Sequence, residues 1–373
     1  MKDGTKERVE IKSLVRPHLL GIDGYTPVEP IEVVARKLGL RPEDISKLDA
    51  NENPFGASPE VAERLAKYDQ FHIYPDPAQG ELREAIGAYV GVDPEQIILG
   101  SGSDEMLDLA ARLFVSPGDA IINFPPTFGM YDFLGSVYNA RLVEVPRNED
   151  FTVDMSAAER ALSDGAKLLL LASPNNPTGN LLPRDQLLRL LEYPVAVVVD
   201  EAYAEFADES SVDLVSEREN LIVVRTFSKW AGLAGVRAGY AVLPPALVEV
   251  AWNVKIPYNQ SVTSEQAILA SLEDRERLME RVSLIIEERE RLAGLLAELP
   301  FLRPFPSTAN FILCEVRGIP AKDVRDRLRR RGILIRYFDS PGLRNCVRIS
   351  VGLSKDTDRV LDALKEVGAK IGR

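Results

Sequence analysis

Four short apolar runs constrain the fold more than any other feature of this 373-residue chain. They cover residues 167–172, 195–199, 221–224 and 238–242, and turn residues bound each of them. Continuous apolar sequence is typical of strands that are buried on both faces, as in a mostly parallel sheet covered by helices. Helical patterns such as residues 103–114 alternate with short apolar strands. We therefore predict a doubly wound α/β domain.

The pattern changes after Pro257, where a long charged helical segment follows from Ser264 to about Leu299. Its charges are typical of a solvated helix face rather than a binding site. From Phe301 onward the sequence predicts a strand, a helix, two strands and a helix. We expect a large α/β domain over residues 49–265, and a smaller α+β domain formed by residues 1–48 and 266–373 with an N-terminal arm.

Composition excludes several classes of partner. The chain has 57 acidic and 45 basic residues, a net charge of −12, which argues against nucleic acid or an anionic membrane surface as partner. Two cysteines and two histidines form neither a disulfide framework nor a zinc-ligand cluster, so we predict no metal site. The N-terminus is charged, and no apolar run approaches the roughly 20 residues of a membrane-spanning helix. We predict a soluble, cytoplasmic protein.

One lysine stands out by its surroundings. Lys229 lies among small and apolar residues, with the hydroxyls of Thr226 and Ser228 before it and Arg237 eight residues after it. Apolar surroundings lower the pKa of a lysine toward a nucleophilic amine that can form a Schiff base with an aldehyde. The hydroxyls and the arginine can hold a phosphate nearby. An aldehyde that bears a phosphate describes pyridoxal 5'-phosphate, although a glycine-rich surface loop is the alternative.

A glycine-containing turn after a predicted strand offers a second phosphate contact. Residues 97–105 read as a strand, a turn with Gly100 and Gly102, and the start of a helix. Main-chain amides at the N-terminus of a helix bind phosphate well. The third glycine of the dinucleotide-binding fingerprint is replaced by Glu105, so a nicotinamide cofactor is disfavoured.

Two further loops place polar side chains directly after apolar runs. Asn176 lies in the sequence SPNNPTG, which follows the run at 167–172, and α/β folds place ligand-binding loops in this position. Asp200 and Tyr203 follow the run at 195–199. Asp200 could bind a metal, cap a helix or pair with a protonated heterocycle. For a pyridine cofactor, a carboxylate keeps the ring nitrogen protonated and makes the ring accept electrons.

The order of GSDE, SPNNPTG, DEAY, TFSKWAGLAGVR and CVRISVG along the chain resembles the fold-type I aminotransferases, which depend on pyridoxal 5'-phosphate. Residues 24–27 (GYTP), the LDANENP segment and the YPD at 74–76 resemble, more narrowly, the histidinol-phosphate aminotransferase family. The resemblance covers nearly the whole chain. It implies a homodimer that exchanges an amino group between histidinol phosphate and 2-oxoglutarate in histidine biosynthesis.

The resemblance also implies roles at the cofactor. Lys229 would carry the cofactor and move the substrate proton, Asp200 would pair with the pyridine nitrogen, and Asn176 and Tyr203 would donate to the phenolic oxygen. Phe128 would stack on the ring, where the family often has a tyrosine, and stacking survives loss of the hydroxyl. The residues implied at the cofactor phosphate are Gly102, Ser103, Asp104, Thr226, Ser228, Arg237 and, from the neighbouring subunit, Tyr74.

At the substrate, the resemblance implies contacts from Tyr25, Asn53, Arg336 and Arg348. A bidentate guanidinium suits both the phosphate of histidinol phosphate and the carboxylates of glutamate. Arg336 could instead face solvent on an edge strand. Three alternatives to the histidinol-phosphate reaction stay open: an aromatic amino-acid aminotransferase, an enzyme like threonine-phosphate decarboxylase, and a non-catalytic regulator that binds the cofactor.

Overall fold

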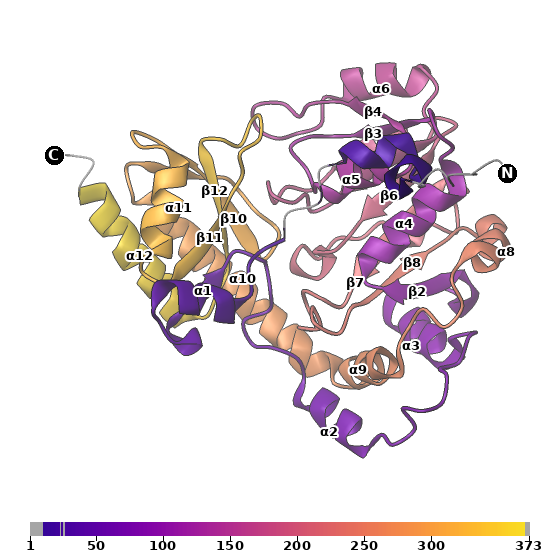
Figure 1. The fold of residues 1–373 in the computed structure, drawn as a ribbon, viewed down its shortest axis with the longest axis horizontal. Helices are drawn as coiled ribbons and strands as arrows, with labels where there is room; N and C mark the ends of the chain where they lie inside the picture. The colour runs from indigo at the N-terminus through magenta and orange to yellow at the C-terminus, as the bar shows by residue number, and fades with distance from the viewer. Residues whose placement is uncertain (1–9, 23, 25–26, 370–373) are drawn as a thin grey trace, which may run out of the picture.

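A computed structural model describes residues 10–22, 24 and 27–369, and it contains two separate β-sheets (Figure 1). The larger sheet has the strand order β2-β8-β7-β6-β5-β3-β4. Only β8 runs antiparallel to its neighbours, so the sheet is mostly parallel, as predicted. Its strands are β2 (Ile97–Ser101), β3 (Ala120–Asn123), β4 (Arg141–Glu144), β5 (Leu168–Ala172), β6 (Ala196–Asp200), β7 (Leu221–Thr226) and β8 (Ala238–Val242).

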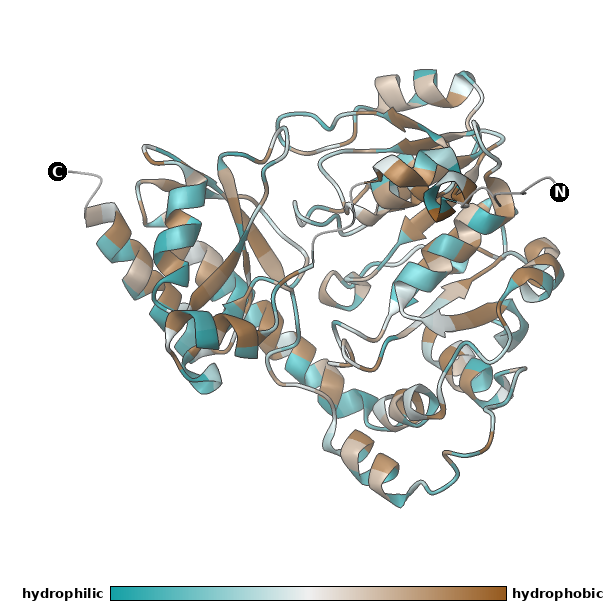
Figure 2. Cartoon of the chain, viewed as in Figure 1, coloured by the Kyte–Doolittle hydropathy of each residue, from teal (hydrophilic) through white to brown (hydrophobic). Residues whose placement is uncertain are grey.

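The four apolar runs became the adjacent strands β5 to β8. Alternate residues of β5 face different hydrophobic clusters, with Leu169 and Leu171 on one side and Leu168 and Leu170 on the other. Both faces of the sheet are therefore buried, which explains why these runs are apolar at every position. Figure 2 shows the hydrophobic strands at the centre and the more hydrophilic helices outside.

Helices cover both faces of the larger sheet. One face carries α3 (Gly80–Val90), α6 (Met155–Ser163), α7 (Arg184–Leu190) and α9 (Val262–Glu273). The other face carries α4 (Ser103–Phe114), α5 (Met130–Val137) and α8 (Pro245–Val254). Helix α2 (Pro59–Lys67) packs against α9. Short 3₁₀ turns are η1 (Ile11–Leu14), η2 (Pro17–Gly21), η3 (Pro42–Asp44), η4 (Pro94–Gln96), η5 (Ala204–Phe206) and η6 (Val212–Leu214).

The smaller sheet is mostly antiparallel and has the order β1-β11-β12-β10-β9. Its strands are β1 (Ser46–Leu48), β9 (Leu302–Pro304), β10 (Phe311–Val316), β11 (Ile333–Tyr337) and β12 (Cys346–Ser350). The accompanying helices are α1 (Ile31–Leu38), α10 (Arg275–Ala297), α11 (Ala321–Arg329) and α12 (Ser354–Ala369). The predicted α+β character of this region is confirmed.

The charged segment from 264 to 299 forms two helices rather than one, because the chain turns at Asp274 between α9 and α10. Leu278 and Val282 of α10 belong to the core of the larger sheet, whereas Leu292 and Leu296 belong to the core of the smaller one. The domain limits at 48/49 and 265/266 stay a prediction. We propose, from this packing, that the second limit lies inside α10.

Candidate active site

A cavity of about 1160 Å³ is lined by residues of both sheets. Parallel strands end at the same edge of a sheet, so the loops that follow β5, β6 and β7 meet there. The predicted site residues that line the cavity are Ser103, Asp104, Phe128, Asn176, Asp200, Tyr203, Thr226, Ser228, Lys229, Arg237, Arg336 and Arg348. Residues far apart in the sequence are thus brought to one place.

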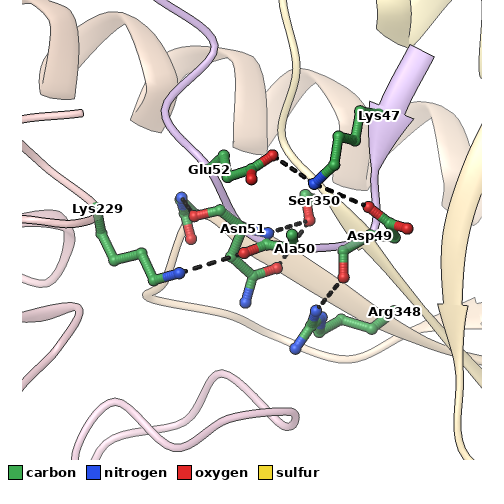
Figure 3. A network of polar contacts seen from close by, with 9 residues as sticks. Lys47, Asp49, Ala50, Asn51, Glu52, Lys229, Arg348 and Ser350 are labelled. Carbon is green, nitrogen blue, oxygen red and sulfur yellow. Dashed lines mark hydrogen bonds and ion pairs between the residues drawn. The ribbon is translucent and has the colours of Figure 1, made fainter. Parts of the chain in front are cut away.

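Lys229 lies in the loop after β7 with its amine directed at residue 50 (Figure 3). The Nζ atom donates a hydrogen bond to the carbonyl oxygen of Ala50 at 3.2 Å. It also lies 5.9 Å from the centre of the Tyr203 ring. Burial, together with the positive charge of Arg348, lowers the pKa of Lys229 to about 8. A neutral amine is therefore accessible near neutral pH, as a Schiff-base lysine requires.

Asp200 ends strand β6 and is buried. The hydroxyl of Tyr131 donates to its Oδ2 atom at 3.1 Å, and the main-chain amide of Ala202 donates to Oδ1 at 3.1 Å. Burial raises the pKa of Asp200 to about 7. A buried carboxyl group is stabilised in its charged form by a nearby cation, and a protonated pyridine nitrogen supplies one. The chemistry of this group therefore fits the cofactor that the sequence predicts.

The phosphate end of the site is formed around the N-terminus of α4. Gly102 precedes this helix with φ of +82°, and a Cβ atom there would lie 2.5 Å from Nη2 of Arg237. Residues other than glycine rarely adopt this backbone conformation. The hydroxyls of Thr226 and Ser228 lie 2.9 Å apart, and Nη2 of Arg237 donates to Asp104 at 2.9 Å. Helix amides, hydroxyls and a guanidinium together fit a phosphate.

Asn176 and Phe128 line the cavity beside these groups. The Oδ1 atom of Asn176 accepts a hydrogen bond from Nη1 of Arg348 at 2.6 Å, so the side-chain amide is held in one orientation. The ring of Phe128 meets the ring of Tyr131 edge-to-face, with 5.8 Å between centroids. A ring held in this way can present its face to a flat ligand.

Two arginines lie opposite each other on the smaller sheet. Arg336 of β11 and Arg348 of β12 are register partners, and their guanidinium carbons lie 5.7 and 5.6 Å from the ring centre of Phe338. Nη2 of Arg348 donates to the carbonyl oxygen of Asp49 at 2.7 Å. Like charges on opposed strand positions destabilise a sheet unless an anion compensates them. The pair is therefore suited to bind a phosphate or a carboxylate.

Three predicted site residues do not line the cavity in the described part of the chain. Asn53 is buried, and its Nδ2 atom donates to the carbonyl oxygens of Lys229 at 3.1 Å and Trp230 at 2.8 Å, so it holds the lysine loop. Tyr74 is 79% exposed and packs on Tyr258 at 4.8 Å. Gly102 acts through its backbone, as described above. The substrate contact of Asn53 and the subunit contact of Tyr74 stay predictions.

Tyr25 lies outside the described residues, so its predicted role stays a prediction as well. Two residues at the site were not predicted. Tyr131 reaches Asp200 from helix α5, and Asn51 reaches Tyr203 from the loop after β1. Tyr131 lies three residues after Phe128, and Asn51 lies in the LDANENP segment. Their partners, however, are 69 and 152 residues away in the chain, and no local pattern reveals such pairs.

Neither a metal site nor a membrane span was found in the described part of the chain. Residues 10–22, 24 and 27–369 contain no group of three or more His, Cys, Asp or Glu side chains arranged to hold a metal ion. No helix within those residues combines the length and apolar character needed to cross a membrane.

Comparison with known proteins places these observations in a family. Residues 43–364 match the family model described as aminotransferase class I and II. The chain is 50% identical to histidinol-phosphate aminotransferase of Roseiflexus castenholzii, covering 96% of this chain and 99% of the relative. It is 46% identical to the chloroplastic histidinol-phosphate aminotransferase 1 of Arabidopsis thaliana, and the match covers 95% of this chain and 86% of the relative.

A solved structure agrees with these relatives. The crystal structure of histidinol-phosphate aminotransferase from Sinorhizobium meliloti in complex with pyridoxal 5'-phosphate superposes with a TM-score of 0.88 at 28% identity, and it covers 96% of this chain and 98% of that one. The fold, the lysine-centred cavity and the matches over nearly the whole sequence lead to one conclusion. This chain belongs to the class I and II aminotransferases and, within them, to the histidinol-phosphate aminotransferases.

Proposed function

We propose that this enzyme transfers an amino group from L-histidinol phosphate to 2-oxoglutarate with pyridoxal 5'-phosphate as cofactor, as a step of histidine biosynthesis. One observation carries the proposal: a lysine with lowered pKa, a buried aspartate and a pair of opposed arginines line the same cavity. The relatives that match nearly the full chain carry this enzyme's name.

Each residue has a separate task in this proposal. The bound cofactor supplies an electron sink for the carbanion that forms when the substrate loses its proton. Asp200 holds a proton on the pyridine nitrogen, which keeps that sink effective. Lys229 would hold the cofactor covalently, and its Nζ would move the proton to and from the substrate carbon that bears the amino group.

The remaining residues position the reactants. The amides at the start of α4, Thr226, Ser228 and Arg237 bind the cofactor phosphate. Asn176 and Tyr203 donate toward the phenolic oxygen, and Phe128 packs on the ring. Arg336 and Arg348 bind the substrate phosphate, and for glutamate they bind carboxylates. Tyr25 and Asn53 keep their predicted place at the substrate.

We also propose that two copies of the chain form the catalytic unit. Tyr74 is 79% exposed in one copy, and large apolar side chains around it are exposed as well. These side chains belong to Phe71, Ile73, Ile256 and Tyr258. Such a patch is stabilised when a second copy covers it. In this arrangement Tyr74 reaches the cofactor phosphate of the partner. The cytoplasmic location predicted from the sequence stays a prediction.

The experiment that tests the proposed reaction compares kcat/KM for histidinol phosphate, phenylalanine and tyrosine with 2-oxoglutarate as acceptor. We expect histidinol phosphate to be preferred, because both arginines then bind a dianion. A preference for phenylalanine would indicate an aromatic amino-acid aminotransferase. Carbon dioxide release without glutamate formation would indicate a decarboxylase, since only a transaminase needs a keto-acid acceptor.

A further inference from the structure

A short chain of hydrogen bonds connects strand β12 to Tyr203 through Asn51. Figure 3 shows the part of it between Ser350 and Asn51. The main-chain amide of Asn51 donates to Oγ of Ser350 at 2.9 Å. The Ser350 hydroxyl donates to Oδ1 of the same asparagine at 2.7 Å. The Nδ2 atom of Asn51 then donates to the hydroxyl oxygen of Tyr203 at 2.9 Å. Asn51 is 1% exposed and Ser350 is 2% exposed, so water does not compete for these bonds.

Each bond has one direction in the structure, and these directions are consistent with one another. A main-chain amide can only donate, so Ser350 accepts from Asn51 and has its own proton left to give. That proton goes to Oδ1, which fixes the orientation of the side-chain amide. The NH₂ group of Asn51 therefore faces Tyr203, and an NH₂ group is a donor. Tyr203 must accept in this contact, and its own proton points to another acceptor.

We propose that Asn51 is a positioning residue that fixes the direction of the Tyr203 hydroxyl proton, so that Tyr203 donates it toward the phenolic oxygen of the cofactor. This inference rests on the proposed function, in which Tyr203 is such a donor. An acceptor at position 51 would take the Tyr203 proton for itself. The identity of residue 51 thus decides whether the tyrosine stabilises the negative charge of the cofactor oxygen.

Side chains from three other segments form hydrogen bonds with the main chain around Asn51. Carbonyl oxygens of residues 49, 50 and 51 accept from Arg348 at 2.7 Å, from Lys229 at 3.2 Å and from Asn310 at 3.0 Å. The loop therefore bridges the arginine that we assign to the substrate and the lysine that we assign to the cofactor. Asn51 has φ of +54°, a conformation that asparagine, aspartate and glycine tolerate better than other residues. Aspartate and glycine variants should keep this backbone.

The charged groups already present near this chain of hydrogen bonds are unchanged in all variants described below, and N51D adds one further charge. Those around Asn51 and Tyr203 are Lys47, Asp49, Glu52, Asp200, Lys229 and Arg348. A hydrogen bond donated to the phenolic oxygen stabilises its anionic form, so the bound cofactor releases its proton at a lower pH. Loss of that donor should raise the pH midpoint of the visible absorption change.

The test is a double-mutant cycle between positions 51 and 203. N51D and N51G are made in the native protein and in the Y203F background, and the absorption of each holoenzyme is titrated with pH. In the native background we expect the N51D midpoint to lie about half to one pH unit above that of N51G, the size of one hydrogen bond. With Y203F, only the effect of the added charge remains, so this difference should fall to less than half.

An equal difference in both backgrounds would overturn the inference, because Asn51 would then act by charge or by folding alone. S350A offers a second variant in which the charge is unchanged, and it also removes the acceptor of the Asn51 main-chain amide. It removes the hydroxyl that orients the amide, and we expect a smaller upward shift that Y203F abolishes. An S350A midpoint identical to that of the native protein would also count against a role for this chain of hydrogen bonds.

Two measurements separate failure of this inference from failure of the proposed function. Borohydride reduction and peptide mapping of each variant show whether the pyridoxyl group is on Lys229, and absence from Lys229 would overturn the proposed function itself. An unchanged midpoint in Y203F alone would remove Tyr203 as a donor and the inference with it. A raised midpoint in Y203F, without coupling to position 51, would overturn only the role of Asn51. Thermal unfolding and equilibrium dialysis of the cofactor identify variants that fail to fold or bind.

Discussion

The cavity joins a side formed by the larger sheet to a side formed by the smaller sheet, and the two are constructed differently. On the larger sheet, Asp200, Thr226 and Lys229 end or follow neighbouring parallel strands, and we propose a different chemical task for each. On the smaller sheet, Arg336 and Arg348 are opposed residues of one antiparallel pair and have the same chemistry. Loss of one group should therefore abolish a function on the first side and only weaken binding on the second.

The largest effect is expected at Lys229. Lys229→Ala should lower kcat/KM by about 10⁴-fold or more, because covalent attachment and proton transfer both depend on this amine. Borohydride reduction of the native holoenzyme should place the pyridoxyl group on this residue. Lys255 is a matched control, since it is also buried and burial lowers its pKa. Label on Lys255 in place of Lys229 would show that a lowered pKa alone misidentifies the lysine.

Tyr74 tests whether the larger-sheet side is completed by a second subunit. Lys229→Ala and Tyr74→Ala protomers should each be almost inactive alone. Equal mixing with random exchange should restore about one quarter of native activity, because half of the dimers then contain one intact site. Subunit exchange is checked with a tagged protomer. If exchange occurs and no activity returns, Tyr74 does not serve the partner's site.

Asp200 should be the next most sensitive position. Asp200→Ala should still bind the cofactor but lose activity by about 10²-fold or more, because an unprotonated ring is a poor electron sink. Asp132 provides the control: it lines the same cavity, and burial raises its pKa too. Asp132→Asn should retain most of the activity. If Asp200→Ala kept the native kcat, the role of Asp200 would be structural only.

The same contrast explains how much of the site the sequence could predict. Lys229, Asp200 and Asn176 each follow an apolar run, so locating the strands also located the residues. Contacts between distant segments were not predictable in this way. Tyr131 meets Asp200 only because α5 packs on the face that β6 presents, and Asn51 meets Tyr203 only through the loop after β1.

Strand register limited the prediction on the smaller sheet. Arg336 and Arg348 are 12 residues apart, and their pairing depends on how β11 and β12 align. A shift by one residue would turn one guanidinium to the opposite face. The prediction of one long charged helical segment was wrong because it, too, depends on a contact between distant parts of the chain. A turn at Asp274 interrupts it, and Ser58 donates to that aspartate from 216 residues away at 2.5 Å.

The arginine pair should show the graded loss expected of the smaller sheet. Arg336→Ala should lower kcat/KM for histidinol phosphate by roughly 10- to 100-fold, since one charge-assisted hydrogen bond is worth about 1.5–3 kcal/mol. Unphosphorylated histidinol should be affected much less. Arg303 lines the same cavity and lies 5.0 Å from the Phe305 ring, so Arg303→Ala is the control. Equal losses for both substrates in Arg336→Ala would mean that this arginine does not bind the phosphate.

The smallest expected effect concerns the stability of the cofactor-free protein, where Asp200 and Lys229 act in opposite directions. Burial raises the pKa of Asp200 from 3.8 to about 7, so the folded state binds more protons than the unfolded state between these values. Stability should fall as pH rises through that window. Burial lowers the pKa of Lys229 from 10.5 to about 8, so between these values the unfolded state binds more protons and stability should rise with pH.

Urea unfolding of the cofactor-free protein at a series of pH values separates the two contributions. Asp200→Asn should lessen the fall between about pH 4 and 7 and leave the rise above pH 8, whereas Lys229→Met should lessen the rise and leave the fall. Arg336→Met should change neither slope, because a guanidinium stays charged throughout this range. If Asp200→Asn unfolded with the native pH profile, burial would not control the charge of Asp200. The two sides of the cavity would then not differ in whether the charges of their side chains change with pH.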